Sequence, residues 1–159
     1  YTPPHVFTAL GCAFDMDVAS PGAGMTWWIP ATRFLTARSL EQKWEGFVWM
    51  NPPFGGRNGL IPWLRKFFEH GNGIALVPDR TSAPWWQQFA PRADLILFVA
   101  PKIKFIGADG KPGTSPAQGT SLMAAGPRGR EALYRAEANR LGVLLGPGRL
   151  EQLKEPPND

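Results

Sequence analysis

The sequence contains short runs that are apolar throughout, and these limit the folds open to the chain more than any other feature. The clearest runs are residues 47–50, 73–78 and 95–99. A strand that is apolar on both faces must be covered on both sides, usually by helices. Between the first two runs, apolar side chains recur at helical spacing over residues 58–70, with charged side chains on the other face. We therefore predict an α/β fold in which a largely parallel sheet is flanked by helices.

Weaker patterns complete the expected order of elements. Residues 3–11 are expected to form a short helix with Val6, Phe7 and Leu10 facing inward. Residues 101–119 are rich in Gly, Pro and Lys, which predicts a long loop in which residues 103–106 could begin a strand. The remaining predicted elements are strands at residues 13–18, 120–125 and 142–145 and helical segments at residues 39–44, 83–89 and 128–141. The whole chain, residues 1–159, is expected to be one domain with a frayed tail at residues 155–159.

Composition excludes several classes of protein. Seven Trp and ten Phe residues carry too much apolar surface for a disordered chain, and no apolar run approaches the roughly 20 residues of a membrane span. A single cysteine excludes an internal disulfide and a cysteine zinc cluster, and two distant histidines argue against a metal site. The net charge of +4 favours an acidic partner, with nucleic acid the first candidate. The paired tryptophans at positions 27–28 and 85–86 are expected in the core, with a base pocket as the alternative.

The expected sheet also predicts where a ligand binds. In parallel α/β sheets, ligands lie beyond the carboxyl ends of the strands, which here points to residues 17–24, 51–57 and 78–86. The first of these segments holds a Gly-x-Gly. It lacks the third small residue of a dinucleotide-binding fingerprint, because Trp27 stands there. We therefore reject a dehydrogenase and leave this loop open between a plain turn and a cofactor loop.

The strongest local signal is the segment Asn51-Pro52-Pro53-Phe54, which follows an apolar run. Each residue before a proline is driven towards extended backbone, so this segment forms a stiff turn. The turn offers the Asn51 side chain and the Pro52 carbonyl as hydrogen-bond acceptors, and Phe54 as a stacking surface. Two acceptors on a planar NH2 group favour a pyramidal nitrogen whose lone pair can attack an electrophile. The turn therefore suits an aromatic amine such as N6 of adenine.

This turn is similar to the catalytic motif of amino-methyltransferases that use S-adenosylmethionine. The opening Thr2-Pro3-Pro4-x-Val6-Phe7 looks like the segment that precedes the cofactor strand in many DNA adenine methyltransferases. Residues 14–19 (FDMDVA) resemble a strand end of the phage-type DNA N6-adenine methyltransferase (Dam-like) family. Leu40 and Trp44 stand before the turn as in that family, and Lys102-Ile103-Lys104-Phe105 resembles a later segment of it. The resemblance covers about residues 1–125.

The resemblance implies a Rossmann-like methyltransferase domain that transfers a methyl group from S-adenosylmethionine to adenine N6 in DNA. It implies that Asn51, Pro52, Pro53 and Phe54 are catalytic and hold a flipped adenine. It further implies a cofactor site formed by Thr2, Pro3, Asp17, Ala19 and Asn51, with Asp17 on the amino group of the methionine part.

The sequence departs from the family at two points. An acidic residue commonly precedes the leucine equivalent to Leu40, whereas this chain has Arg38-Ser39. No convincing acidic ligand for the cofactor ribose occurs between residues 25 and 37.

Basic residues follow the expected strand ends and the long loop. The candidate DNA-binding residues are Arg57, Arg80, Lys102, Lys104 and Lys111. The chain has no room for a separate target-recognition domain, so sequence specificity is expected to come mainly from residues 55–59 and the substrate-facing loop at residues 101–119.

Two other functions stay open at this stage. Related motifs serve enzymes that methylate RNA adenine or a protein glutamine amide, and a nucleic-acid-binding relative could have lost catalysis. The favoured partner is double-stranded DNA, bound by a monomer or weak dimer, with no metal and no membrane. The resemblance implies a cytoplasmic protein of phage or prophage origin in a bacterial host. Restriction protection, replication control and phage defence are all compatible with it.

Overall fold

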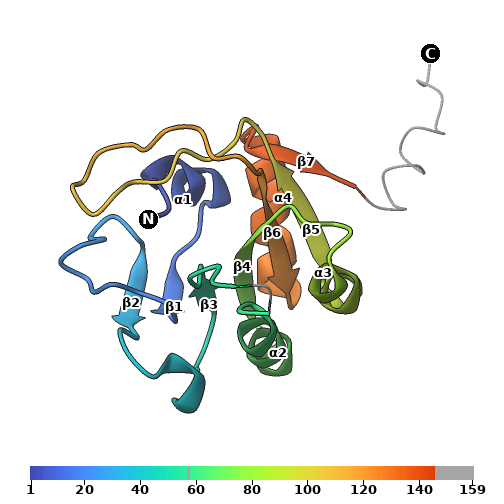
Figure 1. Cartoon of the computed structure of the whole chain (residues 1–159), viewed down its shortest axis with the longest axis horizontal. Coiled ribbons are helices and arrows are strands. Elements are labelled where there is room, and N and C mark those ends of the chain that lie inside the picture. The colour runs from blue at the N-terminus through green and yellow to red at the C-terminus, as the bar shows by residue number, and fades with distance from the viewer. Residues whose placement is uncertain (57, 146–159) are drawn as a thin grey trace.

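The computed structural model describes residues 1–56 and 58–145, and its strands form a single sheet with helices on both faces (Figure 1). The strand order is β2-β1-β3-β4-β6-β5-β7. The strands are β1 (Phe14–Asp17), β2 (Ala31–Phe34), β3 (Val48–Met50), β4 (Gly73–Pro78), β5 (Leu95–Val99), β6 (Thr120–Ala125) and β7 (Gly142–Leu144). The helices are α1 (Pro4–Leu10), α2 (Ile61–His70), α3 (Pro84–Phe89) and α4 (Pro127–Ala138), with short 3-10 turns η1 (Ser39–Glu41) and η2 (Ala90–Arg92). This is the mixed α/β architecture that the sequence predicts.

The expectation of a largely parallel sheet is wrong. Strands β2, β1, β3 and β4 pair in parallel, but β6 is antiparallel to both β4 and β5, and β7 is antiparallel to β5. The antiparallel pairings contain most of the paired residues, because β4 and β6 align over their full lengths from Gly73↔Ala125 to Pro78↔Thr120.

The connections explain why the sequence pattern misleads here. The chain leaves β5 at the carboxyl edge, makes the long loop over residues 100–119 without a helix, and re-enters the sheet as β6 from that same edge. A strand that re-enters the sheet from the edge at which the previous strand left runs antiparallel to that strand. Every residue of β6 is buried nevertheless, so its apolar composition reports burial on both faces and not strand direction.

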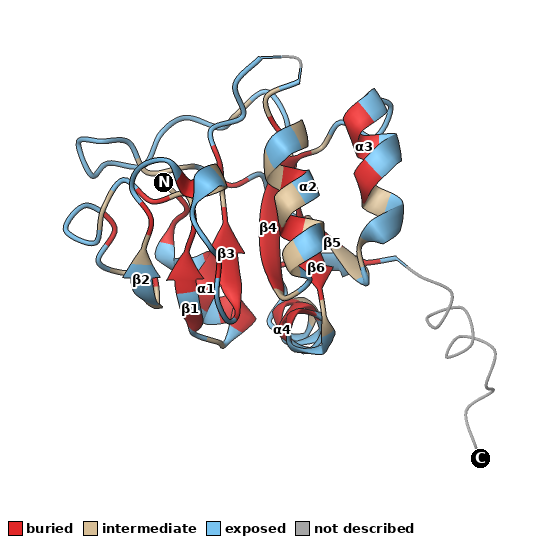
Figure 2. Ribbon diagram, turned by 90° about the horizontal axis from the view of Figure 1, so that it is seen from below, coloured by how far each residue is buried: buried red, intermediate tan, exposed pale blue. Residues whose placement is uncertain are grey.

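Helices cover the two faces of the sheet with two separate apolar cores. Helices α1 and α4 pack on one face over Trp49, Leu76 and Leu122, whereas α2 and α3 pack on the other over Met50 and Val77. Figure 2 shows the buried residues concentrated in strands β3, β4 and β6. The sheet is therefore the middle of three layers.

The predicted elements are largely present, with a few differences. Strand β2 is missed because it is a short edge strand whose middle residues, Thr32 and Arg33, are exposed. Residues 103–106 form no strand and make only an isolated bridge, Ile106 to Pro112. Trp85 and Trp86 are buried as expected, but Trp27 is 79% exposed, because it lies in the irregular connection between β1 and β2. The predicted frayed tail at residues 155–159 lies outside the described residues.

Helix α1 fixes the opening residues against the sheet. Val6, Phe7 and Leu10 are buried as predicted, and the Phe7 ring packs edge-on against Trp49 of β3, with ring centroids 4.9 Å apart. Pro4 begins the helix, and Gly11 ends it in the left-handed conformation. The segment before α1 is thereby held beside the carboxyl end of β3.

Candidate functional site

A cavity of about 690 Å³ opens at the carboxyl edge of the parallel strands. Its walls come from the segments that follow β1, β2 and β3, together with Tyr1, Thr2 and Phe105. Strand β1 has β2 on one side and β3 on the other. The connections from β1 to β2 and from β2 to β3 therefore run in opposite directions across the sheet. Ligands of open α/β sheets bind at such switch points, and the volume is that of a small-molecule site.

Asp17 is the buried charged group of this cavity. It ends β1 with 2% of its surface exposed, and its Oδ1 accepts a hydrogen bond of 3.1 Å from the Ala19 backbone N–H. Burial raises the pKa of this carboxyl from 3.8 to about 6, and the Ala19 hydrogen bond opposes that rise. Within the described residues no cationic side chain pairs with Asp17. A buried carboxylate without a cation is a costly arrangement for a protein unless a positively charged ligand completes it.

The Asn51 side chain is oriented by Thr2. Its Nδ2 donates a hydrogen bond of 2.9 Å to the Thr2 hydroxyl, and both residues line the cavity. Thr2 is 1% exposed, and its own carbonyl accepts a hydrogen bond of 2.8 Å from Trp28 Nε1. Because the amide nitrogen of Asn51 is engaged by Thr2, its Oδ1 is the atom left to accept a hydrogen bond inside the cavity.

The rest of the turn, residues 51–54, forms the cavity mouth. Pro52 is buried, Pro53 is exposed, and the Phe54 ring is 37% exposed, which leaves a face available for stacking. All of these residues line the cavity. Neither proline has a backbone N–H, so the turn presents acceptors without competing donors at these two positions.

Residues 35–41, after β2, form the wall that the sequence left largely unassigned. Leu40 lines the cavity, as does Glu41, which sequence reasoning missed. Arg38 donates from both Nε and Nη2 to Glu41 Oε2, at 2.9 and 2.5 Å, so Glu41 Oε1 remains outside this ion pair. An acidic side chain at the cavity thus follows Leu40 directly, whereas the position before Leu40 holds Ser39.

Trp44 supports this wall from behind. It is 5% exposed, and its Nε1 donates to the Ser39 carbonyl and hydroxyl at 3.0 and 3.1 Å. Trp44 does not line the cavity. Its role at the site is therefore to support residues 35–41 and not to contact a ligand.

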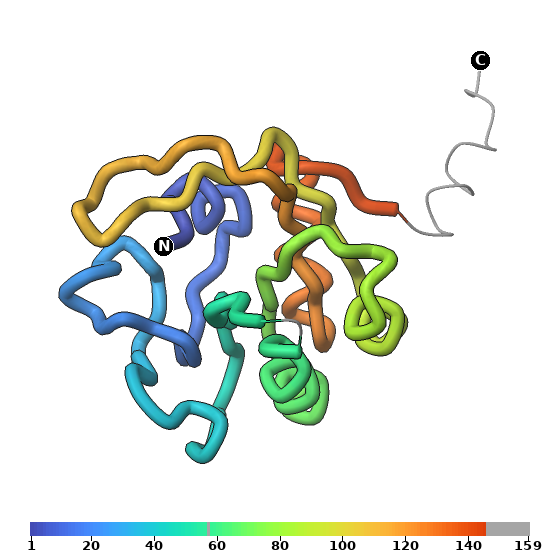
Figure 3. The backbone as a smooth tube through the Cα atoms, in the orientation of Figure 1, coloured from blue at the N-terminus to red at the C-terminus, as the bar shows by residue number. Residues whose placement is uncertain are grey.

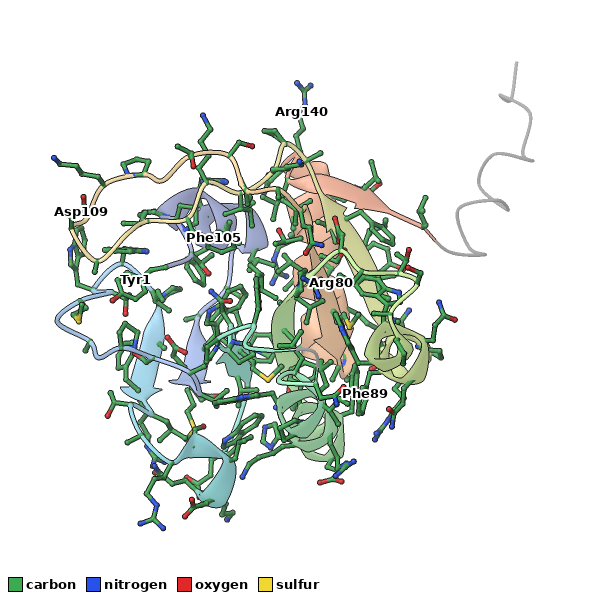
Figure 4. All side chains as sticks on the ribbon, in the orientation of Figure 1. Tyr1, Arg80, Phe89, Phe105, Asp109 and Arg140 are labelled. Carbon is green, nitrogen blue, oxygen red and sulfur yellow. The ribbon has the colours of Figure 1, made fainter. Side chains whose placement is uncertain are left out.

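The long loop between β5 and β6 reaches across to the opening residues (Figure 3). The Ile106 backbone N–H donates to the Tyr1 carbonyl at 2.8 Å, and Tyr1 and Phe105 lie near each other in Figure 4, with Asp109 at the outer tip of the loop. Phe105 faces the cavity, whereas Lys102 and Lys104 are exposed. Lys102 Nζ donates to the Ala117 carbonyl at 2.9 Å, and Lys111 is exposed near the tip.

Other candidate residues lie apart from the cavity. Arg80 is exposed just after β4, and Arg57 lies outside the described residues. Pro3 is buried at the start of α1 and does not line the cavity. In the Gly-x-Gly loop, Ser20 and Pro21 line the cavity but the glycines do not, and Ser20 Oγ accepts from the Gly22 N–H at 2.9 Å.

The described residues lack two further features. They contain no group of three or more His, Cys, Asp or Glu side chains placed to hold a metal ion. None of the helices in this part of the chain has both the length and the apolar character needed to cross a membrane.

Comparison with known proteins gives one match. A family model described as DNA N-6-adenine-methyltransferase (Dam) matches residues 1–126. No curated protein and no solved structure matches the chain. The matched region includes α1, the three strand ends that form the cavity, and the loop up to β6.

Proposed function

The chain belongs to the DNA N-6-adenine-methyltransferase (Dam) family, and from this premise we propose that it transfers a methyl group from S-adenosylmethionine to N6 of adenine in DNA. The observation that carries the proposal is the pairing of two features in one cavity. Asn51 presents an oriented acceptor at the mouth, and Asp17 provides a buried carboxylate without a cation. We further propose that the sheet is a variant of the Rossmann-like methyltransferase fold, which the switch point beside β1 supports.

The cavity residues fit the proposed cofactor. Asp17 would bind the ammonium group of its methionine part, since an ionised carboxylate at the end of β1 lacks a positive partner. The Glu41 Oε1 atom, which Arg38 leaves uncovered, would accept hydrogen bonds from the ribose hydroxyls. Thr2 and Ala19 would lie against the same ligand, and the apolar walls at Leu35 and Leu40 would cover its flat base. When bound, S-adenosylmethionine supplies an electrophilic methyl group carried on a sulfonium sulfur.

The Asn51 turn would activate the amine by position. Asn51 Oδ1 and the Pro52 carbonyl each accept one hydrogen from the adenine N6 amine, and Phe54 stacks on the purine ring. This geometry favours a pyramidal N6 with its lone pair aimed into the cavity. In the proposed reaction N6 would form a bond to the methyl carbon as the bond from that carbon to sulfur breaks, and N6 would then release one proton to solvent. No strong base is required, because the nitrogen loses its proton after it has become positively charged.

The substrate side of the site is basic. Arg80 is exposed just after β4, and Lys102, Lys104 and Lys111 are exposed along the long loop, where they would contact DNA phosphates. In duplex DNA the adenine must first leave the stack, at a cost of a few kcal/mol. Stacking on Phe54, worth about 1–3 kcal/mol, offsets that cost.

The experiment is transfer of radiolabelled methyl groups from S-adenosylmethionine to unmethylated DNA, to RNA and to total protein, offered separately. The wild type is compared with Asn51→Ala and with Asn72→Ala. Asn72 is a matched control because it precedes β4 at the opposite edge of the sheet. We expect label in DNA with the wild type and with Asn72→Ala, and a loss of at least about 100-fold with Asn51→Ala.

Each alternative function has its own outcome. Label in RNA or protein but not in DNA would overturn the assignment of the substrate while leaving the cofactor site in place. Isothermal titration with S-adenosylmethionine tests the inactive relative, since a degenerate domain shows no heat of specific binding.

A further inference from the structure

A second, smaller hollow of about 40 Å³ shares the residue Phe54 with the cavity. Phe54 lines both spaces, so the hollow and the cavity are neighbours. The remaining wall is apolar at Pro78 and Trp85, and its polar side chains are Arg80 and Gln118. At about 40 Å³ against about 690 Å³ for the cavity, this hollow suits one polar group of a ligand and not a second base.

The polar side of the hollow offers hydrogen-bond donors. Arg80 Nε donates to Gln118 Oε1 at 3.0 Å, which fixes the plane of the guanidinium group. The two terminal nitrogens of Arg80 and Gln118 Nε2 are further donors beside that bond. No ion pair neutralises Arg80 within the described residues, and the neighbouring Asp79 carboxylate accepts a hydrogen bond from the Ser121 hydroxyl instead.

The end of the long loop is fixed so that Gln118 meets Arg80. The Asp79 backbone N–H donates to the Gly119 carbonyl at 2.9 Å, which extends the pairing of β4 and β6 by one step. A Cβ at position 119 would lie 2.4 Å from Asp79 Oδ2, so the Asp79 side chain would have to shift to admit one. The loop therefore approaches the end of β4 closely, and Gln118 is held beside the Asn51 turn.

From this arrangement we propose that Arg80, positioned by Gln118, binds an acceptor oxygen of the nucleotide next to the flipped adenine. A hollow of this size with donors on its polar side suits a phosphate oxygen or the O6 edge of guanine. Because the hollow adjoins the cavity at Phe54, on which the target adenine would stack, the bound atom would belong to a nucleotide adjacent to the target. The inference rests on the proposed function, and it adds a specific contact to what was otherwise a general role for basic residues.

The test measures methylation and binding in parallel, on a pool of short duplexes with one central adenine and randomised flanking bases. The variants are Arg80→Ala, Arg80→Lys and Gln118→Ala, with Arg130→Ala as the control for loss of one positive charge. Arg130 is exposed on α4, which begins after the end of β6, and the Gly73↔Ala125 pair places that end at the edge opposite the cavity. Thermal unfolding confirms that each variant is folded.

Two results support the proposal and identify the source of the oxygen. If the oxygen is guanine O6, the wild type prefers guanine beside the target, and both Arg80→Ala and Arg80→Lys reduce that preference by about 10- to 100-fold. If it is a phosphate oxygen, Arg80→Ala weakens binding to all duplexes alike and reduces the salt slope by about 1, while Arg80→Lys retains most of the binding. In either case Gln118→Ala reduces the same property as Arg80→Ala, the guanine preference or the binding to all duplexes, but to a smaller extent.

The proposal is overturned if Arg80→Ala matches Arg130→Ala in base preference, affinity and salt slope. Failure of the proposed function is a separate result, because the wild type would then transfer no methyl group to any duplex. In that case the affinity for the duplexes, measured by fluorescence anisotropy for the wild type, Arg80→Ala and Arg130→Ala, still tests the role of Arg80.

Discussion

Replacing Asp17 by Asn should stabilise the folded protein without ligand while weakening its binding of the cofactor. The Asp17 carboxylate is buried, accepts one hydrogen bond from Ala19, and has a pKa raised by burial to about 6. Asparagine has nearly the same shape and keeps an oxygen for the Ala19 N–H, but carries no charge. The substitution therefore removes the charge with little change in packing.

The magnitude follows from the pKa of Asp17. A rise from 3.8 to about 6 corresponds to about 3 kcal/mol of free energy, at 1.36 kcal/mol for each pKa unit. Below pH 4 the carboxyl is mostly protonated in both the folded and the unfolded chain, so the penalty is small. Between pH 4 and pH 6 the unfolded chain ionises first, and above about pH 6 the full penalty falls on the folded state. The free energy of unfolding of the wild type, relative to that of Asp17→Asn, therefore falls as the pH rises.

The assay is urea unfolding of both proteins without cofactor at pH 4.5 and at pH 7.5. We expect Asp17→Asn to be the more stable protein at pH 7.5, and the gap between the two to widen by about 2 kcal/mol over this range. Asp109→Asn, at the exposed tip of the long loop, controls for the removal of one negative charge. A gap that stays constant with pH, or a variant that is less stable at pH 7.5, would refute the reasoning.

Four further predictions concern the same cavity. Binding of S-adenosylmethionine by the wild type, measured by calorimetry, should weaken as the pH falls below about 6, because the ionised Asp17 carboxylate is the form that pairs with an ammonium group. The variant Asp17→Asn should bind S-adenosylmethionine about 30-fold more weakly than the wild type at pH 8, and its binding should not depend on pH in this way. Thr2→Val should lower kcat about five- to tenfold, because Asn51 loses the hydrogen bond that orients it, while the Kd of the cofactor changes little. Phe54→Ala should raise the KM for DNA by about 5- to 100-fold, and Phe54→Tyr should restore most of it. Trp44→Phe should lower the free energy of unfolding by about 1–2 kcal/mol and weaken cofactor binding, because residues 35–41 lose their support at Ser39; unchanged cofactor binding would contradict this role.

Much of the fold could be predicted because burial leaves a direct mark on composition. The apolar runs at 73–78 and 95–99 are strands β4 and β5, and the helical pattern at 58–70 is helix α2, which begins slightly later than expected. The direction of β6 could not be predicted, because a strand buried on both faces has the same composition whichever way it runs. Strand β2 was missed because an edge strand with exposed central residues has no apolar run.

The candidate site could also be predicted only in part from the sequence. Asp17 ends β1 and Asn51 directly follows β3, so the rule for parallel sheets points to both, and the structure brings them to one cavity. Glu41, Phe105 and Gln118 reach the site through loops whose paths depend on tertiary contacts such as the pairing of Ile106 with Tyr1. Trp27 is exposed because it lies in the irregular connection between β1 and β2, and the residue type alone does not predict this. The biological role and the oligomeric state stay predictions.

The most direct test of the central claim is the chemical identity of the methylated nucleoside. Unmethylated duplex DNA is incubated with S-adenosylmethionine and the protein, digested to nucleosides and analysed by mass spectrometry. We predict N6-methyl-2′-deoxyadenosine as the product of the wild type and its loss with Asn51→Ala. Methylation at a cytosine, or N6-methylation that persists in Asn51→Ala, would contradict the role assigned to the Asn51 turn.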